Sequence, residues 1–513
     1  MRPIRQAQGR PIDINPQAKA ILAAVGSFLD SRKLEAYVIG GFLRDILVGR
    51  QSHDIDLAVA ADPLVVGREL ADALGAHFVA LHEEGSIARI VLPGESVRNL
   101  DLLPLHVEIE ADLAERDFSI NAMAVSLGQL LADGPLSIVD PCGGRRDLAD
   151  GVVRALRPDV FQIDSLRLLR AVRLVAELDF SLDPRTAESA RQDAPLLSQA
   201  AAERQRDELM RILATPRAAP GLRLADELGL LDRLLPELAV IKGEEQPKEH
   251  EWDVFRHSLE TVAALDALLS SDEPPDRHWA RLWGELWREV GQFAAVREHF
   301  QEEVCQGHAR VALLKLSALL HDIAKPETRT FEENGRMRFF GHARVGAARA
   351  AAIMRRLRFS GTEARQVEVM VREHLRPLQT AQDGPPTRRA LYRYFRDTGE
   401  AALDVLVLSL ADHLATVGPR LDWQDWQAHL GLVGHIVAQR FAEEALTPVA
   451  SGRLVSGHDL MEALGLTPGP LVGRLLGAIE EAQGAGEVTA REEALALARR
   501  ELERLTTAEA GEG

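Results

Sequence analysis

Short apolar runs separated by polar residues dominate the N-terminal part of the chain. Residues 17–33 carry apolar positions at helical spacing, and β-rich runs follow at 36–40, 54–60, 77–81, 88–92 and 99–103. Short aliphatic runs with polar or glycine boundaries are typical of strands, whereas apolar residues at i, i+3 and i+4 are typical of helices. We therefore predict one sheet with helices between its strands.

The pattern becomes helical beyond about residue 150. In residues 165–178, Leu166, Leu169, Val172 and Leu178 recur at the spacing of one helix face. An α/β part followed by an all-α remainder predicts the α+β fold class. Polar stretches at 242–251, 270–276 and 381–386 predict a linker and two loops, which places a domain boundary near residue 245.

The composition indicates a soluble globular protein of several domains. The 513 residues are 46% hydrophobic and 27% charged, and the formal net charge is -18. An acidic protein meets a polyanion such as RNA through local basic surface, so the charge makes a nucleic-acid partner less expected without excluding it. The two cysteines allow neither a disulfide framework nor a four-cysteine zinc site, and they indicate a reducing compartment such as the cytoplasm.

No membrane segment is predicted. The N-terminal residues lack the apolar core of a signal peptide. The most apolar later stretch, at 401–417, contains Asp404, Asp412 and His413. We therefore expect neither a signal peptide nor a transmembrane span.

A glycine turn follows the first predicted strand, in the sequence YVIGGFLRD. Gly40 and Gly41 allow a tight turn and expose backbone N–H groups at the start of a helix, and Arg44 lies one turn into that helix. Backbone N–H groups beside a guanidinium form a suitable site for phosphate. A glycine pair at the end of a strand is common, so this signal alone is weak.

Three aspartates lie in the predicted strands. Asp54 and Asp56 are two residues apart, so both lie on one face of a strand, where they can hold a divalent metal. A surface strand also shows this pattern by chance. Asp101 lies in an otherwise apolar strand, where it is either a third acid of the same site or half of a salt bridge at a strand edge. Together with the glycine turn, the three acids predict two-metal phosphoryl or nucleotidyl transfer.

Six motifs give the chain a resemblance to a known family. They are GGxxRD at 40–45, DID at 54–56, ERDFSINAMA at 115–124, DPCGGRRDL at 140–148, DSLRLLRAVR at 164–173 and ERQRDEL at 203–209. Over residues 35–240 the chain resembles class II tRNA nucleotidyltransferases, which comprise CCA-adding enzymes and related bacterial poly(A) polymerases. The resemblance implies a polymerase-β-like nucleotidyltransferase head at 17–148 and a helical neck at 149–241.

The resemblance also implies roles for individual residues. Catalytic Mg²⁺ would be bound by Asp54 and Asp56 with support from Asp101. The triphosphate would be held by Gly41 and Arg44, and the 2′-hydroxyl that distinguishes an NTP would be sensed by Arg116, Asp117 and Asn121. The incoming base would be read by Asp164 and Arg167. The rest of the predicted nucleotide-binding set is Gly40, Asp45, Arg170 and Arg173.

An aspartate and an arginine at i and i+3 suit the recognition of cytosine and adenine. On one helix face, Asp164 and Arg167 place a hydrogen-bond acceptor beside donors. Both bases donate from an exocyclic amine and accept at a ring nitrogen, so one such pair can select C and A without a template. The alternative is an exposed ion pair. Arg170 and Arg173 continue the same face, where they can neutralise phosphate.

The sequence departs from the family pattern at two places. Ile163 stands where the family usually has Glu before the base-reading Asp, so the support of the base-reading pair differs. The connection between Asp101 and Asp112 is short, whereas full CCA-adding enzymes usually carry a longer flexible loop that takes part in the switch from C to A. Enzymes that divide the work into CC addition and A addition resemble this shorter form.

The C-terminal half contains an ordered set of histidines and aspartates. Those that resemble the metal ligands of the HD phosphohydrolase superfamily are His257, His321, Asp322 and Asp412. His342 and His374 fall between them, as candidates for a second divalent metal. The mixed ligand set does not identify the metal. We predict an HD domain at 250–420 that hydrolyses a phosphate ester and a helical tail at 421–513; the alternative is a decayed domain that only binds tRNA.

The sequence as a whole predicts an enzyme that adds C, A or both to the 3′ end of tRNA from CTP and ATP. A poly(A) polymerase, or an enzyme that adds only CC or only A, shares these motifs. Protein-modifying nucleotidyltransferases also join a similar head to an HD domain, but they usually have a GS turn and lack RDFSINAMA. The head acids and the HD ligand set argue against a non-catalytic RNA-binding module.

Overall fold

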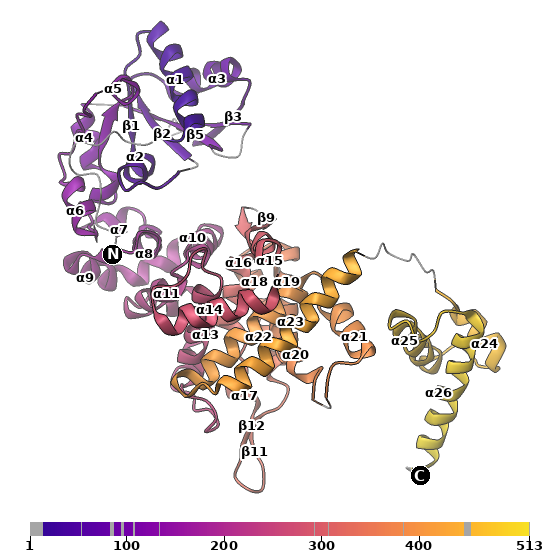
Figure 1. The fold of residues 1–513 in the computed structure, drawn as a ribbon. Coiled ribbons are helices and arrows are strands. Elements are labelled where there is room, and N and C mark those ends of the chain that lie inside the picture. Colours follow the sequence, from indigo (N-terminus) through magenta and orange to yellow (C-terminus); the bar gives the residue numbers. More distant parts are fainter. Residues whose placement is uncertain are drawn as a thin grey trace. The chain divides into compact units, whose positions relative to one another are not determined.

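The structure is a computed structural model, and it describes most of the chain. The described residues are 14–52, 54–82, 87–93, 97–105, 108–132, 134–291, 293–305, 307–382, 384–445 and 453–511. The chain forms two compact units (Figure 1). The head unit comprises residues 1–201 and 224–234, and the C-terminal unit comprises residues 202–223 and 235–513.

A six-stranded mixed sheet forms the centre of the head unit. Its strand order is β3-β4-β5-β2-β1-β6, and β2 and β5 are its parallel pair. The strands are β1 (Ala36–Ile39), β2 (Asp54–Val59), β3 (His77–His82), β4 (Ile87–Val91), β5 (Asn99–Pro104) and β6 (Ala124–Ser126). The first five match the five predicted runs to within one residue at each end, and the predicted α+β class is confirmed.

Helices pack on this sheet. α1 (Pro16–Ser31) is capped by the side chain of Asn15, which accepts a hydrogen bond from the backbone N–H of Gln17. α3 (Pro63–Leu74) lies so close to β4 that a Cβ at Gly67 would be 2.7 Å from Ala88 Cβ. The other helices of this unit are α2 (Gly40–Leu47), α4 (Ile109–Ala114), α5 (Leu127–Leu131), α6 (Gly144–Asp150), α7 (Val160–Ile163), α8 (Arg167–Leu178), α9 (Pro184–Asp193) and α12 (Leu231–Leu234).

The C-terminal unit is built mainly of packed helices. α16 (Arg310–Leu320) is buried along almost its whole length, as expected for a helix that other helices surround. α13 (Val254–Leu268), α19 (Gly361–Glu373) and α22 (Ala402–Val417) pack against it. The remaining helices are α10 (Ala202–Ala214), α14 (Arg277–Val290), α15 (Phe293–Gln301), α17 (Lys325–Thr328), α18 (His342–Arg356), α20 (Arg376–Gln379), α21 (Arg388–Thr398), α23 (Trp423–Ala445), α24 (Gly457–Leu464), α25 (Pro470–Gly484) and α26 (Arg491–Gly511), and α11 (Ala218–Glu227) spans both units.

Three small ladders depart from the expected all-α remainder. They are the parallel pair β7 (Val152–Val153) and β8 (Ser181–Leu182), and the antiparallel pairs β9 (Glu303–Cys305) with β10 (His308–Ala309) and β11 (Arg329–Phe331) with β12 (Met337–Phe339). The β11–β12 hairpin extends away from the neighbouring helices of its unit (Figure 1). Its turn contains Asn334 and Gly335, and the φ of +78° at Gly335 suits this residue pair.

One described segment, residues 388–420, is long and apolar enough to cross a membrane by length and composition alone. Its most apolar window is 72% buried inside the protein. The segment includes α22, in which Asp404 is fully buried. We therefore interpret α22 as a core helix of the C-terminal unit, as its ionisable residues predicted.

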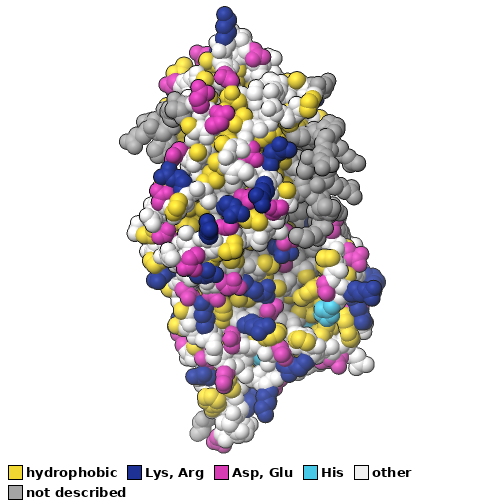
Figure 2. Space-filling model, turned by 90° about the vertical axis from the view of Figure 1, so that its left-hand side faces the viewer, with side chains coloured by type: hydrophobic (Ala, Val, Ile, Leu, Met, Phe, Trp, Pro, Cys, Tyr) yellow, Lys and Arg dark blue, Asp and Glu magenta, His cyan; other side chains and the backbone are white. Residues whose placement is uncertain are grey.

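Opposite charges are intermixed on the surface. On the face shown in Figure 2, the described Lys and Arg side chains lie among Asp and Glu side chains. A face of such mixed charge does not attract a polyanion over long distances. RNA bound at this face would depend on local groups of basic residues.

Candidate active sites

The glycine turn of the head unit brings the start of α2 against one of the predicted acids. Gly40 has a φ of +70°, which residues with a Cβ rarely adopt. A Cβ at this position would lie 2.8 Å from Asp56 Oδ2, so glycine leaves room for that carboxylate. A Cβ at Gly41 would lie 3.6 Å from Arg44 Nη2, so the guanidinium packs directly against this glycine. The turn therefore joins the GGxxRD motif to the DID motif at one site.

The register of the sheet brings the three predicted acids together. In the parallel pair β2–β5, Asp56 lies beside Asp101 and Asp54 lies beside Asn99. Asn99 Nδ2 donates a hydrogen bond to Asp54 Oδ1 at 2.8 Å. Because residues two apart on a strand share a face, the three carboxylates form one acidic row.

Asp101 is held by an arginine that the sequence analysis missed. Arg89 lies opposite Asp101 in the β4–β5 pair and donates two hydrogen bonds to its carboxylate, Nε to Oδ1 at 2.8 Å and Nη2 to Oδ2 at 2.7 Å. β5 lies between β4 and β2, so the alternative interpretation of Asp101 was right about a salt bridge but wrong about a strand edge. The two bonds fix the orientation of Asp101 beside Asp56.

The acidic row fits a divalent cation. Burial, followed by the neighbouring charge of Asp101, raises the pKa of Asp56 to about 6. A bound cation relieves this penalty because it neutralises the carboxylates that repel one another. Hard divalent cations prefer oxygen ligands of this kind.

The predicted triphosphate-binding arginine is tied to two other motif residues. Arg44 donates to Asp45 Oδ1 through Nε at 2.9 Å and Nη2 at 2.8 Å, and to Asn121 Oδ1 through Nη1 at 2.9 Å. Arg44 and Asp45 are both buried. The guanidinium is therefore fixed in place beside the glycine turn rather than free to swing.

The predicted ribose-sensing residues connect this network to α8. Asp117 Oδ2 accepts a hydrogen bond from Arg170 Nη1 at 2.8 Å, and Asp117 Oδ1 accepts from Asn121 Nδ2 at 3.4 Å. Arg116 Nη2 donates to Asp112 at 3.3 Å. The RDFSINAMA motif therefore lies between the glycine turn and α8, the helix that begins with Arg167.

The prediction that Asp164 and Arg167 share a helix face is wrong. α7 ends at Ile163 and α8 begins at Arg167. Asp164 has extended backbone with φ of -146°, and its Oδ1 accepts a hydrogen bond from the backbone N–H of Leu166, so it caps the turn before α8. The two residues stay neighbours, because the Arg167 backbone N–H bonds to the Asp164 carbonyl at 3.1 Å.

Arg170 and Arg173 on α8 have different surroundings. The side chain of Arg170 is 45% exposed and pairs with Asp117, whereas that of Arg173 is 15% exposed and pairs with Glu177 at 2.8 Å. Arg170 therefore has the greater access to a phosphate group.

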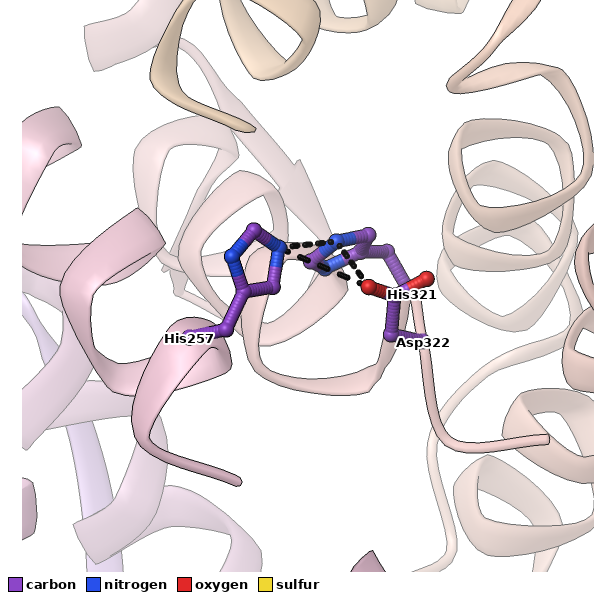
Figure 3. Close-up of side chains that lie close together, drawn as sticks. All are labelled: His257, His321 and Asp322. Carbon is purple, nitrogen blue, oxygen red and sulfur yellow. Dashed lines mark hydrogen bonds and ion pairs between the residues drawn. The ribbon is translucent and has the colours of Figure 1, made fainter. Parts of the chain in front are cut away.

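The C-terminal unit brings its predicted histidines and aspartates into one cluster. His257 comes from α13, the His321–Asp322 pair directly follows α16, and Asp412 comes from α22. His257 Nε2 lies 3.2 Å from His321 Nε2, 3.4 Å from Asp322 Oδ2 and 3.0 Å from Asp412 Oδ1. Figure 3 shows the His257 ring directed at His321 and Asp322.

Two further histidines complete the cluster. His342 is the first residue of α18, and His374 directly follows α19. His342 Nε2 lies 3.4 Å from Asp322 Oδ1 and 3.4 Å from His374 Nε2. Asp322 therefore lies between the His257–His321 pair and the His342–His374 pair, which suits one or two metal ions.

The hydrogen bonds of the rings indicate which nitrogens are available to a metal. The Nδ1 atoms of His321, His342 and His374 each lie 2.7 or 2.8 Å from a backbone carbonyl oxygen. A carbonyl only accepts, so each Nδ1 carries a proton, and the Nε2 of a neutral ring presents its lone pair to the cluster. Asp322 Oδ1 is buried and has no hydrogen-bond partner. Convergent lone pairs and an unsatisfied carboxylate oxygen fit a divalent metal.

The sequence analysis missed residues of the segment 242–251, which it interpreted as a linker. The segment forms neither helix nor strand, but it packs on the cluster. The His250 ring lies 5.5 Å from the His257 ring, and burial, followed by the charge of Lys325, lowers the pKa of His250 to about 4. Gln246 Oε1 accepts a hydrogen bond from Lys325 Nζ, which also lies 2.6 Å from Asp322 Oδ2. A histidine shortly before α13 and a lysine shortly after the HD pair were the available sequence signals.

We expect metal binding at this cluster to release protons. Burial acts to lower the pKa of His321, but Asp322 and Asp412 outweigh it and raise that pKa to about 10, so the metal-free ring carries an extra proton near neutral pH. A cation at Nε2 displaces this proton, so the affinity for Ni²⁺ should rise about tenfold per pH unit between pH 6 and 8.

Calorimetry in buffers of different protonation enthalpy measures the released protons. The measurement uses the variant with both Asp54→Asn and Asp56→Asn, since the head acids form a second candidate metal site. A binding enthalpy that is independent of the buffer would contradict the expectation.

Four family models match the chain. The model "Poly A polymerase head domain" matches residues 36–154, and "Probable RNA and SrmB- binding site of polymerase A" matches 179–242. The model "HD domain" matches 254–417, and a model of tRNA nucleotidyltransferase domain 2 matches 443–498.

Named relatives align with nearly the whole chain. An A-adding tRNA nucleotidyltransferase of Deinococcus radiodurans is 35% identical over 91% of this chain and 95% of its own length. A CC-adding tRNA nucleotidyltransferase of Thermus thermophilus is 35% identical over 90% of this chain and 93% of its own.

A solved structure has the same fold. It is the Thermotoga maritima CCA-adding enzyme complexed with tRNA, with a TM-score of 0.53, 20% identity, and coverage of 95% of this chain and 96% of that one. The identity and coverage of the two relatives show the family that the motifs predicted. The chain belongs to the tRNA nucleotidyltransferases, and it is a nucleotidyltransferase with a C-terminal HD domain.

Proposed function

We propose that this enzyme adds nucleotides to the 3′ end of tRNA and synthesises one part of the CCA sequence, either CC or the final A. The observation that carries the proposal is the short connection after the catalytic strand: β5 ends at Pro104 and α4 begins at Ile109. Residues 106 and 107 lie outside the described residues. A connection of this length leaves no room for the longer loop that takes part in the switch from C to A. The two full-length relatives, one A-adding and one CC-adding, support the proposal.

The head residues would act as follows. Asp54 and Asp56, with Asp101 held by Arg89, would bind Mg²⁺, which activates the tRNA 3′-hydroxyl and neutralises the triphosphate. Arg44, fixed by Asp45 and Asn121, would hold the triphosphate at the glycine turn. The 3′-hydroxyl gives up its proton to solvent as its oxygen bonds to the α-phosphorus, the bond from that phosphorus to the bridging oxygen breaks, and pyrophosphate leaves.

The products formed on defined tRNAs test this proposal. The enzyme alone is incubated with CTP and ATP and with tRNA that ends before the CCA sequence, after C, or after CC, and the products are sequenced. We expect either CC on the first substrate with no A, or A on the third substrate only. Complete CCA on the first substrate would refute the division of labour, and long A tracts would identify a poly(A) polymerase.

We propose that Asp164 and Arg167 select the base. Their backbone hydrogen bond keeps them adjacent even though Asp164 lies outside α8. We therefore expect Asp164→Ala and Arg167→Ala to lose discrimination against UTP and GTP about tenfold or more, with a smaller change in triphosphate binding, because a bidentate contact to a base supplies about 1–3 kcal/mol of discrimination. Competition among all four NTPs measures the ratio, with Arg191→Ala on the exposed part of α9 as the control. An unchanged ratio would assign the base reader elsewhere.

We infer a second activity, metal-dependent hydrolysis of a phosphate ester, in the C-terminal unit. The observation that favours it is the cluster of ring nitrogens and carboxylates around Asp322. His257, His321, Asp322 and Asp412 would bind one divalent metal, with His342 and His374 available for a second, and a bound metal supplies a hydroxide from water near neutral pH. A water oxygen bonds to phosphorus, the bond to the ribose oxygen breaks, and that oxygen takes a proton. We propose that the substrate is a terminal or 2′,3′-cyclic phosphate on RNA. Removing or opening this phosphate helps to expose the hydroxyl that the head requires.

A further inference from the structure

A cavity at the metal cluster continues along the β11–β12 hairpin. The cavity of about 420 Å³ is lined by Asp322, His342, His374 and Asp412 at one side and by residues 336–340 at another. Small-molecule sites usually have volumes of about 300–1,000 Å³, so a single nucleotide fits this space. The hairpin leads directly into the cluster, since Phe340 and Gly341 are followed by His342.

Basic side chains surround this cavity. Lys325 is 5% exposed and lies beside Asp322, and Arg336 and Arg338 line the cavity from the hairpin. Arg336 contacts Glu249 at 3.4 Å, and Arg338 contacts Glu332 at 2.9 Å. Each of these two pairs is substantially exposed, so water and salt weaken it and an incoming phosphate can compete for the arginine.

The hairpin also carries unusually exposed aromatic rings. Phe340 is 70% exposed and Phe331 is 62% exposed, and they are the most exposed large hydrophobic side chains in the described part of the chain. Phe340 lines the cavity, whereas Phe331 lies outside its lining. Aromatic rings beside arginines are the usual combination in sites for single-stranded RNA, because bases stack on the rings and phosphates meet the guanidinium groups.

We propose that the β11–β12 hairpin recognises the terminal nucleotide of a single-stranded RNA 3′ end for the HD site, with the base stacked on Phe340 and the flanking phosphate at Arg336 and Arg338. This inference rests on the proposed hydrolase activity and adds a requirement for a nucleoside. The terminal phosphate would lie beside the ammonium group of Lys325, next to the metal cluster. Because Phe340 and His342 are only two residues apart, a base stacked on Phe340 keeps the reacting phosphate near the metal cluster.

RNA fits these observations better than a protein partner does. A protein-docking surface needs a broad apolar patch, whereas residues 336–340, Arg-Met-Arg-Phe-Phe, place two basic side chains beside two aromatic ones. The cavity also ends at ionisable groups that a phosphate can engage. A surface for protein docking requires neither feature.

Steady-state hydrolysis by the metal-loaded full chain tests the proposal. The substrates are adenosine 2′,3′-cyclic phosphate and a short RNA with a 3′-phosphate, compared with bis-p-nitrophenyl phosphate and p-nitrophenyl phosphate, which carry no nucleoside. We expect Phe340→Ala to raise the KM for the nucleotide substrates about five- to a hundred-fold, with little change in kcat or in the hydrolysis of the nitrophenyl esters. Phe340→Tyr should restore the KM, because it keeps the ring.

Phe331→Ala is the matched control, since it removes a similarly exposed ring, from strand β11, that lies outside the cavity lining. It should leave every rate unchanged. Equal losses in Phe331→Ala and Phe340→Ala, or a Phe340→Ala enzyme with unchanged KM for nucleotides, would overturn the inference and leave the hydrolase intact. A wild-type enzyme that hydrolyses neither class of ester with Mn²⁺, Ni²⁺ or Mg²⁺ would overturn the proposed hydrolase and this inference with it.

Discussion

Replacement of Asp56 by asparagine is expected to lower the rate of nucleotide addition about a hundred- to a thousand-fold, the size of effect seen when one electrostatic stabiliser of a transition state is removed. Asp56 lies in register with Asp101 and against the glycine turn, where a Cβ at Gly40 would be 2.8 Å from its Oδ2. Asparagine keeps the shape but loses the charge that a divalent metal requires. Asp54→Asn should have a similar effect, because Asp54 shares the acidic row.

Binding of tRNA separates this chemical effect from unfolding. Contacts to RNA are spread over many backbone phosphates, so the affinity for tRNA should stay within about threefold of the wild type. Asp72→Asn, the same change at an exposed position on α3, is the matched control and should add nucleotides at the normal rate. Addition within tenfold of the wild type by both Asp54→Asn and Asp56→Asn would remove these residues from the metal site.

The strands of the head could be predicted from local sequence because each is a short aliphatic run. The register between strands could not, because it depends on pairing across distant parts of the chain. Arg89 illustrates the difference. It lies in the run ARIVL, which predicted a strand and no partner for the arginine. Only the β4–β5 pairing shows that Arg89 holds Asp101.

The proposed base-reading pair shows where helical periodicity is misleading. Residues 165–178 have the apolar spacing of a helix, and the helix is present from Arg167. An aspartate near a helix start prefers to accept hydrogen bonds from backbone N–H groups, so Asp164 leaves the helix and caps the turn. The preference of aspartate for helix caps could be inferred from the sequence. The motif at 164–173 instead favoured the interpretation that Asp164 lies on the helix.

In the C-terminal unit, the order of the histidines and aspartates was sufficient to predict which residues meet. Residues without a motif were missed. His250 lies in a polar segment that resembles a linker, and its position beside His257 is set by tertiary packing. The hairpin had a readable signal in Asn334–Gly335, but its strands β11 and β12 are each too short to stand out from the surrounding helical pattern.

Replacement of Asp322 by asparagine should remove most of the metal from the C-terminal unit and lower phosphate-ester hydrolysis at least about a hundred-fold, since loss of a ligand costs more than loss of a residue that only orients one. Asp322 Oδ2 lies 3.1 Å from His321 Nε2 and Oδ1 lies 3.4 Å from His342 Nε2, so the one carboxylate joins both pairs of histidines. Nucleotide addition should continue at the normal rate, because the acids proposed for that reaction belong to the head unit.

The experiment has to take account of the buried lysine beside Asp322. Lys325 Nζ lies 2.6 Å from Asp322 Oδ2, and a buried ammonium that loses its carboxylate partner destabilises a protein by about 3–5 kcal/mol. Asp322→Asn could therefore lose metal because the unit unfolds, so His342→Gln is made in parallel, since it removes a candidate ligand and keeps the ion pair between Asp322 and Lys325. Asp272→Asn, in the exposed loop before α14, is the control.

Metal content, hydrolysis of adenosine 2′,3′-cyclic phosphate and nucleotide addition are measured on each variant. Hydrolysis at the wild-type rate in both cluster variants would show that the C-terminal unit is a scaffold, whereas its loss with addition intact would establish two independent active sites in one chain.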